Sequence, residues 1–128
     1  MISITKTYRF EAAHHLPNHK GKCARPHGHS YRVDVTVSGP IKVDEGQSDA
    51  GMVMDFDDLD SIVKPLIEVC DHHDLNDVLY FRTTAERFAD WFSYQIRYAL
   101  EALHSGVDLT EVMVWETEKS RATWRPDA

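Results

Sequence analysis

The sequence has little of what would assign a protein to a class at once. Its 128 residues include only two cysteines, Cys23 and Cys70, which are too few for a disulfide framework. No apolar run approaches the ~18 residues of a membrane span, and the N-terminus shows no basic, apolar leader. We therefore expect a cytoplasmic protein with free thiols and no membrane partner.

Positive charge is also scarce. The chain has 14 Lys and Arg residues against 21 Asp and Glu residues, a formal net charge of -7. A surface for a nucleic acid needs clustered positive charge, so we expect no nucleic-acid partner. A small anionic substrate is compatible with the local cluster Lys20, Lys22 and Arg25. The alternative is that these three are solvated loop charges.

There is no internal repeat or low-complexity tract, and 42% of the residues are hydrophobic. A chain of this length and composition can bury a core of its own. We expect residues 1–128 to form a single domain.

The spacing of apolar residues predicts a series of strands. Apolar and polar residues alternate over 2–10 and again over 31–38, which indicates two half-buried strands. The polar run 44–51 predicts a loop, and the apolar segment 52–56 predicts a short third strand. Alternation returns over 107–117.

Two helices are expected between these strands. The first should span about 57–69, with Pro65 kinking or breaking its second half. The second has a capping-box spacing between Thr83 and Glu86, followed by an apolar stripe at helical period, and Gly106 is expected to stop it.

Residues 122–125 could add a final short strand. The resulting order β-β-β-α-α-β predicts the α+β class, with an antiparallel sheet and both helices on one face. Such a sheet leaves edges open, so we expect closure through identical subunits.

The most informative motif is His-Gly-His at residues 27–29. Side chains at i and i+2 of a strand point the same way, so His27 and His29 form a pair, and Gly28 keeps their backbone uncrowded. His14, at the end of the first predicted strand, offers a third imidazole. Three neutral nitrogen donors with a free fourth position are typical of catalytic zinc, and we expect Zn²⁺ here.

Cys23 lies just before this motif and admits three interpretations. It can be an incidental buried residue, a fourth ligand that closes a structural zinc site, or a reactive thiolate. Its polar, cationic loop favours the thiolate, which can accept a proton from carbon beside a Lewis-acidic metal. Cys70 ends an apolar helix and is expected in the core.

Two acidic residues add to the candidate site. Asp71 precedes His72 and can orient its imidazole as a proton shuttle, although polar clusters at helix ends are common. Glu116 shares the parity of the apolar residues Val112 and Val114, so its carboxylate needs a partner. A ligand edge with two adjacent N–H donors would suit it. The alternative is a frayed strand end in water.

Together these motifs resemble those of 6-pyruvoyltetrahydropterin synthases and their relatives, the 6-carboxytetrahydropterin synthases. The matching segments are Phe10–His14, Cys23–Tyr31, Gly51–Phe56, Asp71–Asn76 and Trp115–Thr117. The resemblance covers nearly the whole chain. It implies the tunnelling fold, with a four-stranded antiparallel sheet, two helices on one face, and trimers that assemble into a hexameric barrel with active sites between subunits.

The resemblance also implies roles for individual residues. It makes the three histidines named above the zinc ligands, Cys23 the base, and Asp71 with His72 a proton relay donated by a neighbouring subunit. Glu116 would anchor the pterin ring.

Two residues near the start of the second helix, Thr84 and Glu86, resemble those that frame the pterin pocket. The sequence departs from some members at Ala85, where they have a hydroxyl residue.

The three residues between Cys23 and the His-Gly-His motif, Ala24–Pro26, resemble the shorter loop of the 6-carboxytetrahydropterin branch. That branch implies a lyase that converts 7,8-dihydroneopterin triphosphate to 6-carboxytetrahydropterin, acetaldehyde and triphosphate for deazapurine and queuosine biosynthesis. Two alternatives remain: the pyruvoyl-forming reaction, which retains all side-chain carbons, and a non-catalytic binding module stabilised by zinc.

Overall fold

The computed structural model describes residues 1–103 and 105–127. Within them, one sheet contains strands in the order β3-β1-β2-β4-β5. The strands are β1 (Ile2–His14), β2 (His27–Gly39), β3 (His73–Asp74), β4 (Asp108–Thr117) and β5 (Ser120–Trp124). The helices are α1 (Phe56–Cys70), α2 (Leu75–Val78) and α3 (Ala85–Ala102), with a one-turn 3-10 helix, η1 (Lys22–Ala24).

The sheet confirms the α+β class but corrects the expected four antiparallel strands. It has five strands, and β3 runs parallel to β1, pairing Ala12 with His73 and Ala13 with Asp74. The other pairings are antiparallel. A two-residue strand inside a polar cluster has no room for a period-2 pattern, so alternation could not reveal β3.

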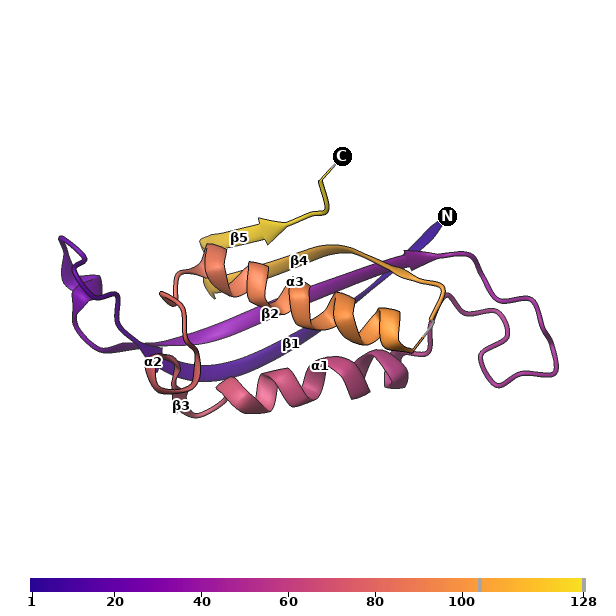
Figure 1. The fold of residues 1–128 in the computed structure, drawn as a ribbon, viewed down its shortest axis with the longest axis horizontal. Coiled ribbons are helices and arrows are strands. Elements are labelled where there is room, and N and C mark those ends of the chain that lie inside the picture. The colour runs from indigo at the N-terminus through magenta and orange to yellow at the C-terminus, as the bar shows by residue number, and fades with distance from the viewer. Residues whose placement is uncertain (104, 128) are drawn as a thin grey trace.

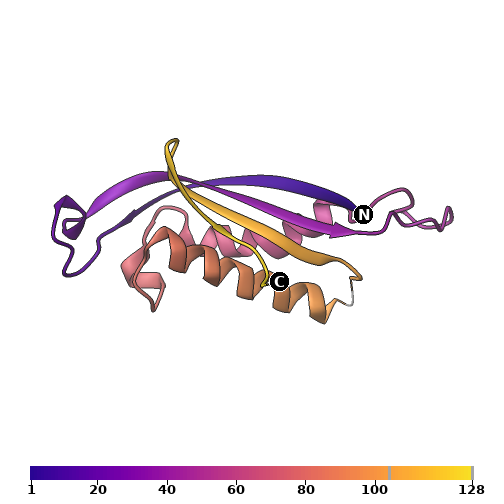
Figure 2. The same ribbon diagram turned by 90° about the horizontal axis from the view of Figure 1, so that it is seen from above.

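Helices α1 and α3 lie beside each other across one face of the sheet (Figure 1). In the view from above, none of the helices of residues 1–103 and 105–127 lies on the opposite face (Figure 2). Among the helices that the structure describes, none is both long and apolar enough to cross a membrane. The core between sheet and helices includes Tyr8, Phe10, Tyr31, Val33, Val35, Val112, Val114, Leu59, Val63, Phe88, Phe92 and Ile96.

The N-terminal end of α1 corrects the expected strand over 52–56. The Asp55 side chain accepts a hydrogen bond from Asp57 N, so the helix starts at Phe56. Residues 52–55 form no strand, although Val53 and Met54 are buried. Their apolar side chains pack against the core. In the sequence, a short apolar run that is buried without regular structure cannot be told from a short buried strand.

Pro65 does not interrupt α1, which continues to Cys70. Pro65 lacks the N–H that would bond to the carbonyl of Ser61 four residues earlier. Both residues are exposed, so water can satisfy that carbonyl.

The cap of α3 is one residue later than predicted. Thr84 is the N-cap, and its side chain accepts from Arg87 N at 3.2 Å. Thr83 is instead fully buried. The helix ends at Ala102, so Gly106 is not its stop. With φ of 72°, Gly106 supports the left-handed turn that leads into β4.

Candidate metal centre and active site

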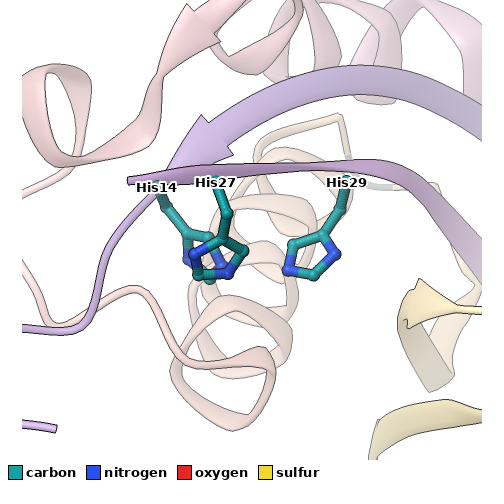
Figure 3. A group of neighbouring side chains, drawn as sticks. All are labelled: His14, His27 and His29. Atoms are coloured by element: carbon teal, nitrogen blue, oxygen red, sulfur yellow. The ribbon is translucent and has the colours of Figure 1, made fainter. Parts of the chain in front are cut away.

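Three imidazoles converge where β1 ends and β2 begins. The antiparallel register places His14 directly opposite His27, and His29 follows two residues along β2. Figure 3 shows the three rings projecting to the same side of the strands. One nitrogen from each ring can be chosen so that all three lie within 4.8 Å of one another. This group can hold a metal ion, as the His-Gly-His spacing predicted.

In two of the rings, those of His14 and His27, Nδ1 is already hydrogen-bonded to a backbone carbonyl group. Nδ1 of His14 lies 3.0 Å from the Thr83 carbonyl oxygen, and Nδ1 of His27 lies 2.8 Å from that of Arg25. A carbonyl only accepts, so each Nδ1 carries the proton and each Nε2 keeps its lone pair. Nε2 of His14 is buried and has no hydrogen-bond partner among the described residues. A metal ion would satisfy it, so the donors fit a metal.

The environment lowers the pKa of two of these rings, those of His14 and His29. Burial, together with the neighbouring His27 and His29, lowers the pKa of His14 to about 4. Burial and His27 also lower the pKa of His29. Neutral imidazole is the form that binds metals, so the rings of His14 and His29 are ready to coordinate at neutral pH.

Gly28 is less important than the sequence suggested. A Cβ at this position would meet only the Ala12 carbonyl oxygen, at an ordinary 3.6 Å. The backbone is not crowded there, because Gly28 faces the opposite side of the sheet from the two histidines. Crowding therefore does not require glycine at position 28.

Glu116 lies beside the histidine group. Glu116 lies at a register shift in the pairing of β4 with β5, and its carboxylate is 3.5 Å from Nε2 of His14 and 3.8 Å from Nε2 of His29. Burial and the nearby Glu86 raise the pKa of Glu116. The expected clash of a carboxylate with an apolar face is thus avoided, because Glu116 meets imidazoles rather than the aliphatic core.

A hollow beside Glu116 separates β5 from the first turns of α3. Its lining includes Glu86 and Glu116, together with Trp124. The hollow does not include Thr84, whose hydroxyl caps the helix. Of the two residues predicted at the helix start, Glu86 therefore lies at this hollow with Glu116, and Thr84 does not.

Cys23 is half-buried in η1, within the loop that joins β1 to β2. The loop extends beyond the end of the sheet (Figure 1), and its base is held by Leu16 N donating to Cys23 O at 2.8 Å. The sulfur is not in the group of potential ligand atoms. The predicted core cysteine, Cys70, is buried, and burial raises the pKa of its thiol to about 12.

Asp71 and His72 form a contact, and neither belongs to the group of three potential metal ligands. Asp71 Oδ1 accepts from Glu11 N at 3.0 Å and lies 2.9 Å from Nδ1 of His72. The Glu11 N–H, followed by His72, lowers the pKa of Asp71. The His72 side chain is 78% exposed, so the pair faces outward from the chain.

Two residues at the site were not predicted from the sequence. Thr83 holds His14, but its sequence position suggested a helix cap. Tyr31 is fully buried against the rings of His14 and His29, and its hydroxyl has no hydrogen-bond partner among the described residues. Its position two residues after His29 on the same face was the available signal.

Known proteins match both the sequence and the fold. The family model for 6-pyruvoyl tetrahydropterin synthase matches residues 3–127. A Synechocystis 6-carboxy-5,6,7,8-tetrahydropterin synthase is 44% identical, over 82% of this chain and 83% of the relative. A Pyrococcus furiosus dihydroneopterin monophosphate aldolase is 34% identical, over 84% and 82%.

The fold is shared with the solved 6-pyruvoyl tetrahydropterin synthase of Caenorhabditis elegans. The TM-score is 0.81 at 23% identity, with 98% of this chain and 96% of the other covered. The chain belongs to the 6-pyruvoyl tetrahydropterin synthase family.

Proposed function

We propose that this protein is a zinc-dependent 6-carboxy-5,6,7,8-tetrahydropterin synthase. The observation that carries the proposal is the convergence of His14, His27 and His29 beside Glu116, in a chain 44% identical to a synthase of that name. The reaction converts 7,8-dihydroneopterin triphosphate and water to 6-carboxytetrahydropterin, acetaldehyde and triphosphate. We assign it to the cytoplasm and to queuosine biosynthesis, on the sequence resemblance alone.

Zinc, held by the three histidines, would supply a Lewis acid at the side-chain oxygens of the substrate. Three nitrogen donors leave a fourth position for those oxygens. The raised pKa of Glu116 reflects its burial, and a pterin edge with two N–H donors would give this carboxylate the bidentate partner that it lacks. Glu86 lies at the same hollow and frames the ring, with Thr84 two residues before it in the sequence.

Cys23 is the proposed base that accepts the side-chain proton. Its sulfur is free of the ligand group and partly exposed, as a reacting thiolate must be. The loop also carries Lys20, Lys22 and Arg25, whose charges suit the triphosphate of the substrate.

The relay of Asp71 and His72 is assigned to the site of a neighbouring subunit. Two features support this assignment: the pair faces outward, and the sheet edges are open. Among the residues that the structure describes, β1 has no partner on its outer side beyond its contact with β3 at Ala12 and Ala13, and β5 has none on its own outer side. Open edges favour pairing with further copies, consistent with trimers stacked into a hexameric barrel.

The identity of the products tests the proposal. Purified protein loaded with zinc and given 7,8-dihydroneopterin triphosphate should release acetaldehyde and a 6-carboxy pterin, identified by mass spectrometry. A product that retains every side-chain carbon would assign the pyruvoyl-forming reaction instead. Absence of turnover by folded, zinc-loaded protein would favour the binding module.

A further inference from the structure

The face of the sheet opposite the helices carries a continuous row of cationic and aromatic side chains. Arg9 of β1 lies opposite Arg32 of β2. Trp115 of β4 pairs with Arg32 on one side and with Arg121 of β5 on the other. The guanidinium carbons of Arg32 and Arg121 lie 4.9 and 4.6 Å from the Trp115 ring centre. We call these four residues the arginine row. In Figure 2, none of the described helices covers this face.

The carboxylate of Asp34 lies beside the arginine row, and its oxygens already accept four hydrogen bonds. Asp34 accepts two hydrogen bonds from Arg32, each 3.0 Å long, one from Thr7 at 2.7 Å and one from Trp115 at 3.1 Å. Burial favours protonation of Asp34, but these donors outweigh it and lower its pKa. Asp34 therefore neutralises Arg32 alone.

Arg9 and Arg121 have no such partner. Neither forms an ion pair with any residue in the described part of the chain. Glu11, two positions from Arg9, accepts from Ser30 at 2.9 and 2.7 Å instead. The row thus has excess positive charge in a protein whose net charge is -7.

A bound anion would balance the two charges that remain unpaired, those of Arg9 and Arg121. Asp34 already balances Arg32, which lies directly opposite Arg9. Arg9 and Arg121 are exposed, so core packing does not explain them. Stacking on Trp115 uses the flat face of a guanidinium and leaves its in-plane N–H donors for oxyanions.

We propose that the arginine row is a binding site for a small polyphosphate, separate from the metal centre. Arg9 and Arg121 are three strand spacings apart, about 14 Å at roughly 4.8 Å each. A single phosphate is too small to reach both ends of the row, whereas a chain of phosphates can contact successive guanidinium groups bidentately. Inorganic triphosphate and the phosphate chain of a nucleoside triphosphate share this chemistry. The site does not depend on the proposed function.

Calorimetric titration of the zinc-loaded full-length protein with inorganic triphosphate tests the proposal. The double variant Arg9→Gln/Arg121→Gln should bind about tenfold more weakly or worse. Arg87→Gln removes the same type of charge from α3, on the other side of the sheet, and should bind like the wild type. Arg121→Gln alone changes only one exposed edge-strand residue and should weaken binding about threefold, so it serves if the double variant is unstable.

A His29→Ala chain separates this site from the metal centre. It should retain triphosphate binding, because His29 faces away from the row. Repeating the titration with ATP distinguishes the two possible ligands of the row. If ATP binds as tightly as triphosphate, the ligand is a nucleotide; if triphosphate binds clearly more tightly, the ligand is the inorganic ion. Unchanged binding by folded Arg9→Gln/Arg121→Gln would overturn the proposal, as would binding that His29→Ala abolishes and the arginine variants retain.

Discussion

Thr83 presents two oxygens to His14: its backbone carbonyl and its hydroxyl each lie 3.0 Å from Nδ1 of the imidazole. Thr83 is fully buried and immediately precedes the cap of α3. The start of the helix therefore fixes the ring at the end of β1. This arrangement directs Nε2 of His14 towards the other two histidines. In metal sites, hydrogen bonds to the nitrogen that does not bind the metal orient the ring in the same way.

Replacing Thr83 by Val should weaken metal binding about tenfold, because the hydroxyl is lost while the carbonyl stays. Thr83→Ser keeps the hydroxyl and should bind metal like the wild type. Competition with a chromophoric zinc chelator measures both. Equal zinc affinity in the Val and Ser variants would show that the hydroxyl does not contribute to metal binding.

Cys23→Ala should lower kcat at least about a hundredfold, since the proposed proton acceptor is gone. Zinc content and the thermal unfolding midpoint should stay at wild-type values, because the sulfur is outside the ligand group. Metal analysis and steady-state kinetics of the same sample give the answer. Loss of zinc from the variant would instead make Cys23 a ligand.

The outward-facing relay makes a prediction for mixed assemblies. His72→Gln and Cys23→Ala should each be inactive alone, whereas subunits of the two variants refolded together should regain activity at about a quarter of their sites. That fraction is expected for random mixing when the thiol and the relay come from different chains. Recovery should be absent if both groups of a site belong to the same chain.

The metal-free protein should lose stability in weak acid. The unfolded chain protonates His14 near pH 6.5, but the folded chain does so only near pH 4, so protons favour unfolding between these values. This difference lowers the free energy of unfolding by about 3 kcal/mol as the pH falls from 6.5 to 4. Urea unfolding of chelator-treated protein should show the decline, and His14→Gln should reduce it. An identical decline in that variant would contradict the assignment.

Much of the candidate site could be predicted because its spacing is local. Side chains two residues apart on a strand share a face whatever the tertiary structure, so the pair His27 and His29 was evident in the sequence. His14 joins them through the β1–β2 register, which apolar alternation specifies.

Other features depend on long-range contacts. Thr83 lies 69 residues from His14, and no local pattern links them. The parallel strand β3 has only two residues, too few for a pattern. Pro65 is tolerated inside α1 because it lies on the exposed side of the helix, which the sequence alone did not reveal. In the same way, the row of Arg9, Arg32 and Arg121 emerges only when the sheet is assembled.

The most direct test is a crystal structure of the zinc-loaded protein with anomalous scattering measured at the zinc edge. The anomalous peak should lie among Nε2 atoms of His14, His27 and His29, at about 2.0–2.1 Å from each, with the fourth position open to solvent or substrate. A peak elsewhere, or one at bonding distance from the Cys23 sulfur, would contradict the proposed centre.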